Sequence, residues 1–533
     1  MSKTVPAATS DQKTPAFPSL PLPKSHPNHL AAMARLFGVP AASPATARVL
    51  ELGCGNGSNL LPMADAFPLA SFVGVDPDRA SIDVGQRFAK AAELTNVELR
   101  NEDFGAFSAP GKTFDYIIIH GVYSRVPEAT QQRLWEICRT HLAENGIAYF
   151  SYNVLPGANM RRSMREIASL HTSGLDKPGE RVKQTRAILK FLADSVPADD
   201  NAYGVMLRNE LGFASKTNDR VVFHDYLAPD QSALYFHEFA AQAEAHRLQY
   251  VCESTLSDML STNFPEAVTS TLARVGNIVA QEQYMDFLRN RMFRQTLLCP
   301  SAVRIRRNLT PDAVKSLAFQ AAFNTNPRKV DLTPGVAVVF SNASGQQIST
   351  GDAFTKAALS VLSDHALRAV GFNELLEAAR TRSRPLIERP AADLAKQEEA
   401  SLATNLLSLL TKGFIDLYAE SGNARSEVPA KPRVSRFHRL QATTGTQITS
   451  HLNVPVPVDA LGRVLLSHCD GTRTVGQLVD LVVRESQSGV LQVQQGKKPL
   501  RDAAKLRAFL TPQVENILNG LARGGLFLTP TAS

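Results

Sequence analysis

Short apolar runs alternate with amphipathic stretches between residues 48 and 152. The runs predict strands at 48–52, 71–75, 97–100, 114–120 and 146–152, and the stretches between them predict helices at 59–67, 79–94 and 128–142. Several runs, such as 116–119, are apolar on both faces, which is typical of parallel strands covered by helices. The pattern therefore predicts a doubly wound, Rossmann-like α/β sheet.

The alternation changes after residue 158. Residues 158–245 are mostly helical in pattern and predict an insertion, with a basic start at Arg161, Arg162 and Arg165. Residues 248–252 are short and apolar enough to return to the sheet as a strand. The pattern assigns no final strand, and residues 258–298, including 293–298, are predicted to be helical. We expect one domain over 28–255, followed by a helical regulatory or linking region over 256–345.

The C-terminal third contains a weak internal repeat, with units at 355–418 and 459–528. Each unit has two apolar helices, at 357–362 and 372–379 in the first and at 461–466 and 475–483 in the second. Each then ends with a helix, a basic residue, glycine and an apolar strand. This order is the outline of a winged helix. We expect winged-helix-like modules at 346–420 and 459–530, joined by a basic linker at 421–458.

Composition and charge fit a globular protein with no dedicated nucleic-acid surface. Hydrophobic residues make up 44% of the 533 positions, charged residues 20%, and the net charge is +7. The basic excess is concentrated at 301–350, with six basic and two acidic residues, and at 421–458, with five and one. Both segments resemble solvated connectors, so a nucleic-acid partner is not expected, and the oligomeric state stays open.

Targeting signals and cysteine pairs are not evident. Residues 1–27 carry six prolines and no apolar core of a signal peptide, which predicts a disordered leader. No run of about 18 apolar residues predicts a membrane span. The five cysteines are widely spaced and form no Cys-x-x-Cys pair, so we expect a cytoplasmic protein without disulfides. No metal site is predicted.

The strongest chemical signal is a glycine-rich loop after the first predicted strand. The run 49–57 reads Val-Leu-Glu-Leu-Gly-Cys-Gly-Asn-Gly, which places Gly53, Gly55 and Gly57 between a buried strand and a helix. Glycines there let the backbone approach a ligand closely, and the amides at the start of the helix favour an anionic group. A loop of this kind alone also fits a dinucleotide site.

Three acids indicate which kind of ligand the glycine-rich loop binds. Glu51, Asp76 and Asp103 end or follow the first three predicted strands, at the sheet edge where open α/β folds bind ligands. Asp76 suits ribose hydroxyls, Asp103 an exocyclic amine, and Glu51 an ammonium group. An ammonium, a ribose and an adenine describe S-adenosylmethionine better than a dinucleotide. The alternative for Asp76 is a turn and helix cap with Asp78.

These motifs resemble class I S-adenosylmethionine-dependent methyltransferases. The longer string at 114–124, with Tyr152-Asn153, Pro156-Gly157 and 224–227, resembles a bacterial subgroup that carries a methyltransferase regulatory domain. That subgroup includes the rickettsial protein-lysine methyltransferases, and the resemblance covers the chain from about residue 25 to 528. It implies S-adenosylmethionine as cofactor and a protein substrate. The cofactor-binding positions that it implies are Glu51, Gly53, Gly55, Gly57, Asp76, Asp103, Phe104, His120, Gly121 and Val122.

Residues on the side of the methyl acceptor match the family pattern less well than residues on the side of the cofactor. The family commonly has tryptophan where Arg125 stands and near Ala158. His120 is a candidate proton acceptor, and Tyr123 and Tyr152 are candidate catalytic residues that would line an acceptor channel. Each has a structural alternative, as a hydrogen-bonded histidine or as packing aromatics.

The resulting hypothesis is a methyltransferase that transfers methyl groups to protein lysine, with C-terminal modules that select the acceptor. The alternatives are a small-molecule methyltransferase, or a nucleic-acid-binding winged-helix protein with a methyltransferase domain. Against nucleic acid, residues 355–420 hold eight basic and nine acidic residues. A DNA-binding helix should be basic because phosphate contacts dominate its affinity.

Overall fold

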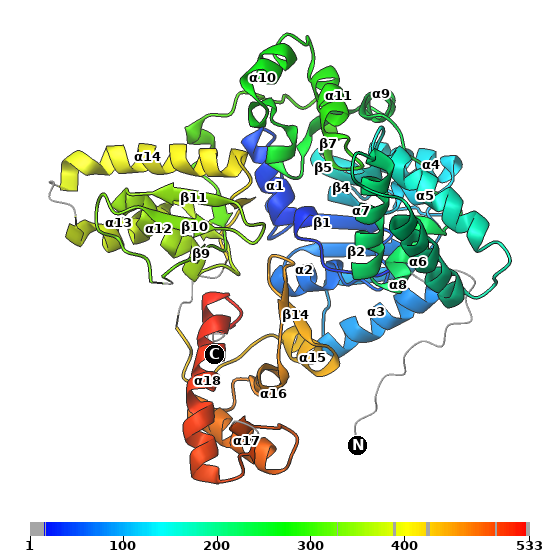
Figure 1. Cartoon of the computed structure of the whole chain (residues 1–533). Coiled ribbons are helices and arrows are strands. Elements are labelled where there is room, and N and C mark those ends of the chain that lie inside the picture. The colour runs from blue at the N-terminus through cyan, green and yellow to red at the C-terminus, as the bar shows by residue number, and fades with distance from the viewer. Residues whose placement is uncertain are drawn as a thin grey trace.

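The fold is taken from a computed structural model of the whole chain (Figure 1). It describes residue 15 and residues 17–327, 329–386, 391–422, 427–495 and 498–528. Most of the leader predicted at 1–27 lies outside these residues. The described part is packed: a short helical turn covers Pro23–Ser25, and α1 (Pro27–Leu36) is almost wholly buried. The predicted disorder therefore does not extend over 17–27.

A mixed seven-stranded sheet forms the centre of the N-terminal domain, in the order β3-β2-β1-β4-β5-β7-β6. All pairings among the first five strands are parallel, and β7 runs antiparallel to both of its neighbours. The Rossmann-like prediction is confirmed. The strands are β1 (Arg48–Leu52), β2 (Ser71–Asp76), β3 (Val97–Asn101), β4 (Phe114–Ile119), β5 (Leu142–Asn153), β6 (Leu248–Glu253) and β7 (Phe293–Pro300).

The segment 293–298 is strand β7, so the predicted helix there is wrong. Its residues Thr296, Leu297 and Leu298 are fully buried between β5 and β6. A short apolar run satisfies either a buried helix or a buried strand, and only the free sheet position between β5 and β6 decides between them. This strand is the one that the sequence pattern could not place.

Helices cover both faces of the sheet (Figure 1). A separate layer of helices, the insertion, follows the C-terminal end of β5. The sheet is flanked by α2 (Leu60–Ala66), α3 (Arg79–Ala92), α4 (Glu128–His141) and α9 (Phe236–Ala245), together with α1. The insertion consists of α5 (Ala158–His171), α6 (Pro178–Ser195), α7 (Ala202–Lys216) and α8 (Asp219–Tyr226), which lie within the predicted range of 158–245. The insertion has its own apolar core, including Leu189, Leu207 and Val222. Helices α10 (Glu266–Leu272) and α11 (Ile278–Arg289) connect β6 to β7.

The region after the sheet contains strands as well as helices, so 256–345 is not wholly helical. Strands β8 (Ala318–Gln320), β12 (Val370–Gly371) and β13 (Asp416–Tyr418) form one small sheet, and β9 (Asn324–Thr325), β10 (Val338–Ser341) and β11 (Gln347–Thr350) form another. They accompany α12 (Ala353–Asp364), α13 (Phe372–Ser383) and α14 (Ala391–Thr411). The middle strand β8 precedes residue 346, so this unit extends beyond the predicted module.

The C-terminal part has a second apolar core and packs below α2 and α3 (Figure 1). It contains α15 (Arg436–Thr444), β14 (Gln447–Thr449), β15 (Pro455–Pro457), α16 (Ala460–His468), α17 (Val475–Gln487), β16 (Gln494–Gln495), β17 (Lys498–Pro499) and α18 (Ala503–Arg523). Much of the predicted linker at 421–458 is thus folded structure. Within the described residues, no helix is both long and apolar enough to cross a membrane.

Candidate functional site

The loop after β1 has the backbone that its glycines predict. Gly53, Gly55 and Gly57 all have positive φ angles, of 85°, 55° and 76°. A Cβ atom on Gly53 would lie 2.2 Å from a methyl carbon of Val122, beyond the end of β4. Glycine is therefore needed at Gly53 both for its φ and for the close approach of the β4 end.

Asp76 ends β2 and faces this loop. One of its carboxylate oxygens accepts a hydrogen bond of 2.8 Å from the Gly55 N–H, and the other accepts one of 2.9 Å from the Asp78 N–H. Burial raises the pKa of Asp76. Asp78 itself caps α3 by accepting from the Ala80 N–H. Asp78 is therefore the helix cap, whereas Asp76 both forms the turn to Asp78 and holds the glycine-rich loop.

Glu51 is buried behind the loop and has one unpaired oxygen. Its Oε1 accepts a 2.8 Å hydrogen bond from the side chain of Asn59, whereas its buried Oε2 has no partner among the described residues. Burial, with a smaller contribution from Asp76, raises the pKa of Glu51 to about 8. An unpaired buried carboxyl is costly, and an ammonium group would relieve it. The site thus fits the amino-acid end of S-adenosylmethionine.

The predicted adenine-side and β4-side residues lie at the same edge. Phe104 is buried and lies near Gly53, whereas Asp103 is exposed and accepts a 2.7 Å hydrogen bond from the Gly105 N–H. Gly121 has a φ of 67°, and its N–H donates to Ser151 Oγ at 2.7 Å. The strand ends thus bring most of the predicted cofactor positions together.

His120 follows β4 and is held by neighbouring aromatic residues. Its Nδ1 lies 3.0 Å from the Tyr149 hydroxyl, and its ring stacks on Tyr149 and meets Phe293 edge-on. Burial, and to a smaller extent the charge of Arg125, lowers the pKa of His120 to about 4. The imidazole is therefore neutral near pH 7, so it can accept a hydrogen bond but is too weak a base to be a good proton acceptor.

Tyr123 and Tyr152 lie inside an aromatic core. Both side chains are 1% exposed, and the Tyr152 ring stacks on Phe239 with 3.9 Å between ring centroids. The Tyr123 hydroxyl donates to Gln242, and the Tyr152 hydroxyl lies 3.0 Å from Thr296 Oγ1. The two residues do not line the cavity described next. Their position favours the packing role over the acceptor-channel role.

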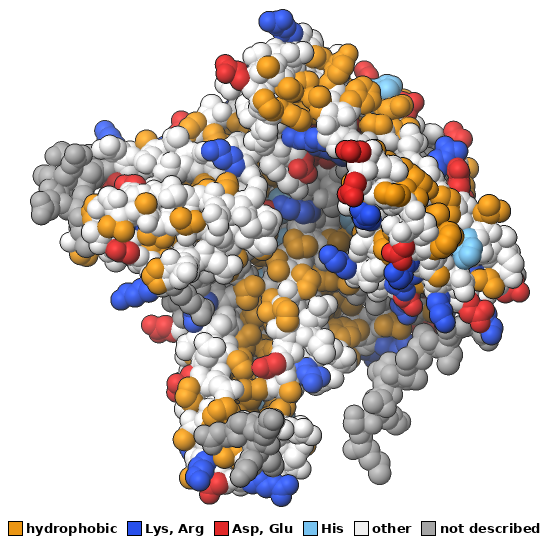
Figure 2. Space-filling model, in the orientation of Figure 1, with side chains coloured by type: hydrophobic (Ala, Val, Ile, Leu, Met, Phe, Trp, Pro, Cys, Tyr) orange, Lys and Arg blue, Asp and Glu red, His pale blue; other side chains and the backbone are white. Residues whose placement is uncertain are grey.

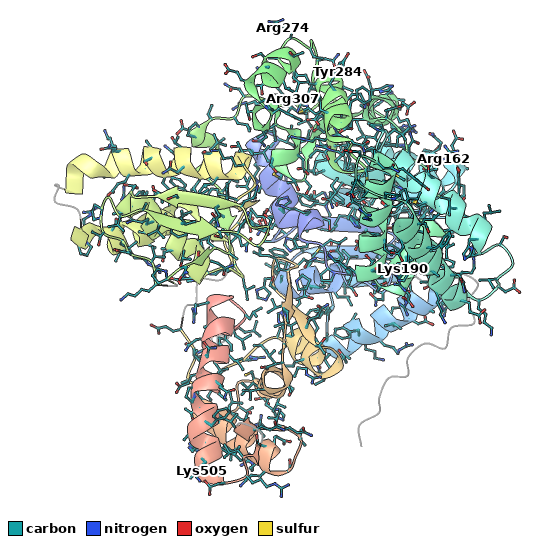
Figure 3. All side chains as sticks on the ribbon, in the orientation of Figure 1. Arg162, Lys190, Arg274, Tyr284, Arg307 and Lys505 are labelled. Carbon is teal, nitrogen blue, oxygen red and sulfur yellow. The ribbon has the colours of Figure 1, made fainter. Side chains whose placement is uncertain are left out.

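A cavity of about 690 Å³ lies between the insertion helices and the ends of β5 and β7. Four arginines line it, Arg125, Arg161, Arg162 and Arg165, against two acids, Asp225 and Glu166. Arg125 links the cavity to the β4 end, because its guanidinium donates to the Gly121 carbonyl at 3.2 Å. It also pairs with Asp225 at 2.9 Å. Figure 3 shows Arg162 on the insertion, above Lys190.

Sequence reasoning missed the contacts that the N-terminal segment makes. Ser19 Oγ donates to the Cys54 carbonyl in the glycine-rich loop, and the Leu22 N–H donates to Asn59 Oδ1. Phe17 lies under the Arg125 guanidinium, 4.3 Å from it. The Ser and Asn residue types suit such contacts, but nothing in the local pattern predicts partners so far away in sequence.

Comparisons with known proteins place this geometry in a family. Residues 49–146 match the model described as a methyltransferase domain, 218–300 the predicted methyltransferase regulatory domain, and 430–526 the PKMT C-terminal winged helix domain. An uncharacterized protein of Rickettsia prowazekii is 31% identical over 512 residues, covering 94% of this chain and 91% of the relative. The chain belongs to the class I methyltransferases with a regulatory domain and a PKMT winged helix domain. The resemblance inferred from the motifs is confirmed.

Two solved structures are similar to nearly the whole of this chain. PKMT2 from Rickettsia typhi, in complex with AdoHcy, has a TM-score of 0.86 and 29% identity, covering 96% of this chain and 100% of its own. A second structure of PKMT2 has a TM-score of 0.84 and 28% identity. The enzyme is therefore S-adenosylmethionine-dependent, as predicted. The winged helix match begins at residue 430, inside the segment that the sequence analysis assigned to a linker.

Proposed function

We propose that this methyltransferase transfers methyl groups to lysine side chains of a protein in the cytoplasm. The observation that carries the proposal is the similarity to PKMT2 over 96% of the chain, which includes the parts outside the methyltransferase sheet. The cytoplasmic assignment is supported by the five cysteines, which are all free and buried.

The proposed cofactor contacts follow from the site geometry. S-adenosylmethionine, when bound, supplies an electrophilic methyl group on a positively charged sulfur. Glu51 Oε2 would accept from its ammonium group, Asp76 would accept from its ribose hydroxyls, and Asp103 with Phe104 would meet the adenine. The cofactor would approach the loop backbone closely at Gly53, Gly55 and Gly57. Its methyl-bearing end would lie beside His120, Gly121 and Val122.

The chemistry requires alignment more than acid–base catalysis. An in-line displacement needs a nucleophile on the methyl axis and the exclusion of water. A lysine acceptor must be neutral, and burial beside a positive sulfur lowers the pKa of its ammonium group. His120 is neutral near pH 7 because its pKa is about 4. It is thus suited to orient an amine by accepting a hydrogen bond, and a strong base is not needed.

The arginine-lined cavity is the proposed entrance for the acceptor. It reaches the β4 end through Arg125 and the β7 start through Phe293, which contacts His120. Three of its arginines are paired with carboxylates, whereas Arg165 bonds only to backbone carbonyls. The small positive excess that remains favours acidic residues around the methylated lysine. Figure 2 shows that this face of the molecule is hollowed near its centre, with Lys and Arg side chains at the hollow. An open, charged surface of this kind suits a polypeptide acceptor.

The test uses isotopically labelled S-adenosylmethionine and a cell lysate. We expect label in a macromolecular fraction that survives nuclease and is lost on protease treatment, with the label recovered in methyllysine after hydrolysis. The Asp76→Ala variant should give a much lower signal at a cofactor concentration near the wild-type dissociation constant. Label that is sensitive to nuclease, or confined to small molecules, would contradict the proposal and favour one of the two alternatives.

A further inference from the structure

Three potential metal ligands meet where the C-terminal domain packs on α2. Asp65 is on α2, His438 is on α15, and His451 is in the turn between β14 and β15. One donor atom from each residue lies within 4.8 Å of the donor atoms of the other two. His438 Nδ1 and Asp65 Oδ2 are 3.6 Å apart. Two ligands at about 2.0–2.2 Å from a shared ion are separated by a comparable distance.

The tautomer of His438 directs a lone pair towards Asp65. Its Nε2 lies 2.8 Å from the Thr449 carbonyl, which can only accept, so Nε2 carries the proton. Nδ1 is then an acceptor, on the side of Asp65. Histidines that bind metals usually donate their other ring N–H to a carbonyl or carboxylate in this way, which fixes the ring orientation.

The hydrogen-bond donors at this point are too few for the acceptors. The Ser435 hydroxyl lies 2.7 Å from Asp65 Oδ2 and 2.8 Å from His438 Nδ1, and its single proton can serve only one of them. No hydrogen bond joins the ring nitrogens of His451 to another of the described residues, although its ring lies 5.4 Å from that of His438. A cation between these groups would engage the acceptors that the hydroxyl cannot.

The charges also lack compensation. Among the described residues, His438 is the only basic group within salt-bridge distance of Asp65. A buried carboxylate that has no lysine or arginine beside it is stabilised by a metal cation.

We propose that Asp65, His438 and His451 bind a divalent transition-metal ion, with Zn²⁺ as the expected ion. One carboxylate and two imidazoles suit Zn²⁺ or Fe²⁺ and are a poor set for Ca²⁺ or Mg²⁺, which prefer oxygen ligands. The site lies within a domain interface and away from the predicted methyl-transfer residues. A non-redox ion with a structural role is therefore favoured.

The ion would clamp the winged helix domain to the helix that follows the glycine-rich loop. α2 begins at Leu60, directly after Asn59, which hydrogen-bonds to Glu51. Figure 1 shows β14 and α15 beside α2. Metal binding at the far end of α2 would thus hold the interface next to the cofactor site.

The first experiment measures metal content in full-length protein purified without a histidine tag. We expect about one Zn²⁺ per chain by plasma mass spectrometry, and its loss in an Asp65→Asn, His451→Ala double variant. His171→Ala is the matched control, because His171 is exposed on the distant helix α5 and should leave the metal content unchanged. Less than a tenth of an ion per wild-type chain, after incubation with Zn²⁺ and dialysis, would overturn the proposal, as would equal content in the double variant.

The second experiment does not depend on the variants folding. Wild-type protein stripped with a chelator and titrated with Co²⁺ should develop the visible absorption of cobalt bound to nitrogen and oxygen ligands, saturating near one equivalent. The melting temperature should fall on chelation and recover with Zn²⁺, because the ion binds only the folded interface. A featureless cobalt spectrum, with a melting temperature unaffected by chelator, would rule out the site.

Discussion

At the scale of single residues, Asp76 holds the loop and is the proposed ligand of the cofactor ribose. We expect Asp76→Ala to weaken S-adenosylmethionine binding by about 30–1000-fold, or about 2–4 kcal/mol, because two charge-assisted hydrogen bonds are lost. Isothermal calorimetry measures this. The control is Asp78→Ala, which removes the cap of α3 and should lower stability more than affinity. An unchanged dissociation constant in folded Asp76→Ala would leave Asp76 with a role in the turn alone.

Glu51 predicts a pH dependence for cofactor binding. With a pKa of about 8 in the free protein, the carboxyl is mostly protonated at pH 7. A bound ammonium group favours the ionised form and lowers this pKa, so binding releases a proton and affinity rises with pH up to about 8. Calorimetry at pH 7 in buffers of different ionisation enthalpy should show release of about one proton. Glu51→Gln should remove the release. An equal proton count in both proteins would exclude Glu51 as its source.

The sequence located the residues at strand ends better than it described their surroundings. Glu51, Gly53, Asp76 and Gly121 could be placed because parallel strands bring their carboxyl ends to one edge. The acceptor-channel prediction for Tyr123 and similar aromatics could not be checked from the sequence, because an aromatic residue after a strand suits a channel and a core equally well. Only the position of α9 above these rings favours the core.

At the scale of elements, β7 contains a buried charge network. The Arg294 side chain is fully buried and bonds to Glu253 at 2.6 Å, to Glu282 at 2.8 Å and to Asp286 at 2.8 Å. Arg294→Met would leave three carboxyl groups without their shared cation. We expect a loss of about 3–5 kcal/mol in the free energy of unfolding, measured by urea denaturation.

The matched control for this variant is Arg162→Met. The exposed pair between Arg162 and Glu166 on α5 should contribute at most about 1 kcal/mol. Similar losses for the two variants would mean that the β7 network adds nothing beyond an ordinary surface pair.

Arg294 also explains why the sequence pattern of β7 was misleading. Arginine is rarely fully buried, so its presence in the segment favoured the surface of a helix.

The turn between β14 and β15 reaches the cofactor site through side chains. Asn453 Nδ2 donates to Asn59 Oδ1 at 2.9 Å, and Asn59 donates to Glu51. Asn453→Gly removes this contact without strain, because residue 453 has a φ of 57°. We expect cofactor affinity to fall by about 2–10-fold, as one or two neutral hydrogen bonds would allow. Unchanged affinity, measured by calorimetry, would show that Asn59 keeps its orientation without the turn.

At the scale of the whole molecule, the domain order was largely readable and the domain contacts were not. The repeat of two helices and a basic-glycine ending indicated the C-terminal winged helix, which the family match confirms from residue 430. Its start was misjudged because α15 is polar on average, so it resembled a linker. Packing against α2 and α3 stabilises it, and such contacts leave no local pattern.

The charge distribution of the whole chain predicts weak binding to nucleic acid. Residues 459–533 hold nine basic and six acidic residues, too small an excess for a dedicated DNA surface. Fluorescence anisotropy with duplex DNA should give a dissociation constant no tighter than about 10⁻⁶ M at physiological salt, the nonspecific range. Tight binding that weakens steeply with salt would instead support the nucleic-acid alternative for the winged helix.

The contact between Asn453 and Asn59 also sets an order of events during synthesis. The two residues are 394 positions apart. At roughly 5–20 residues per second, about 20–80 seconds separate the synthesis of the first from that of the second. Throughout that interval the nascent sheet lacks the turn that steadies Asn59. The predicted contribution of Asn453 to cofactor binding therefore begins only after this turn of the last domain has left the ribosome.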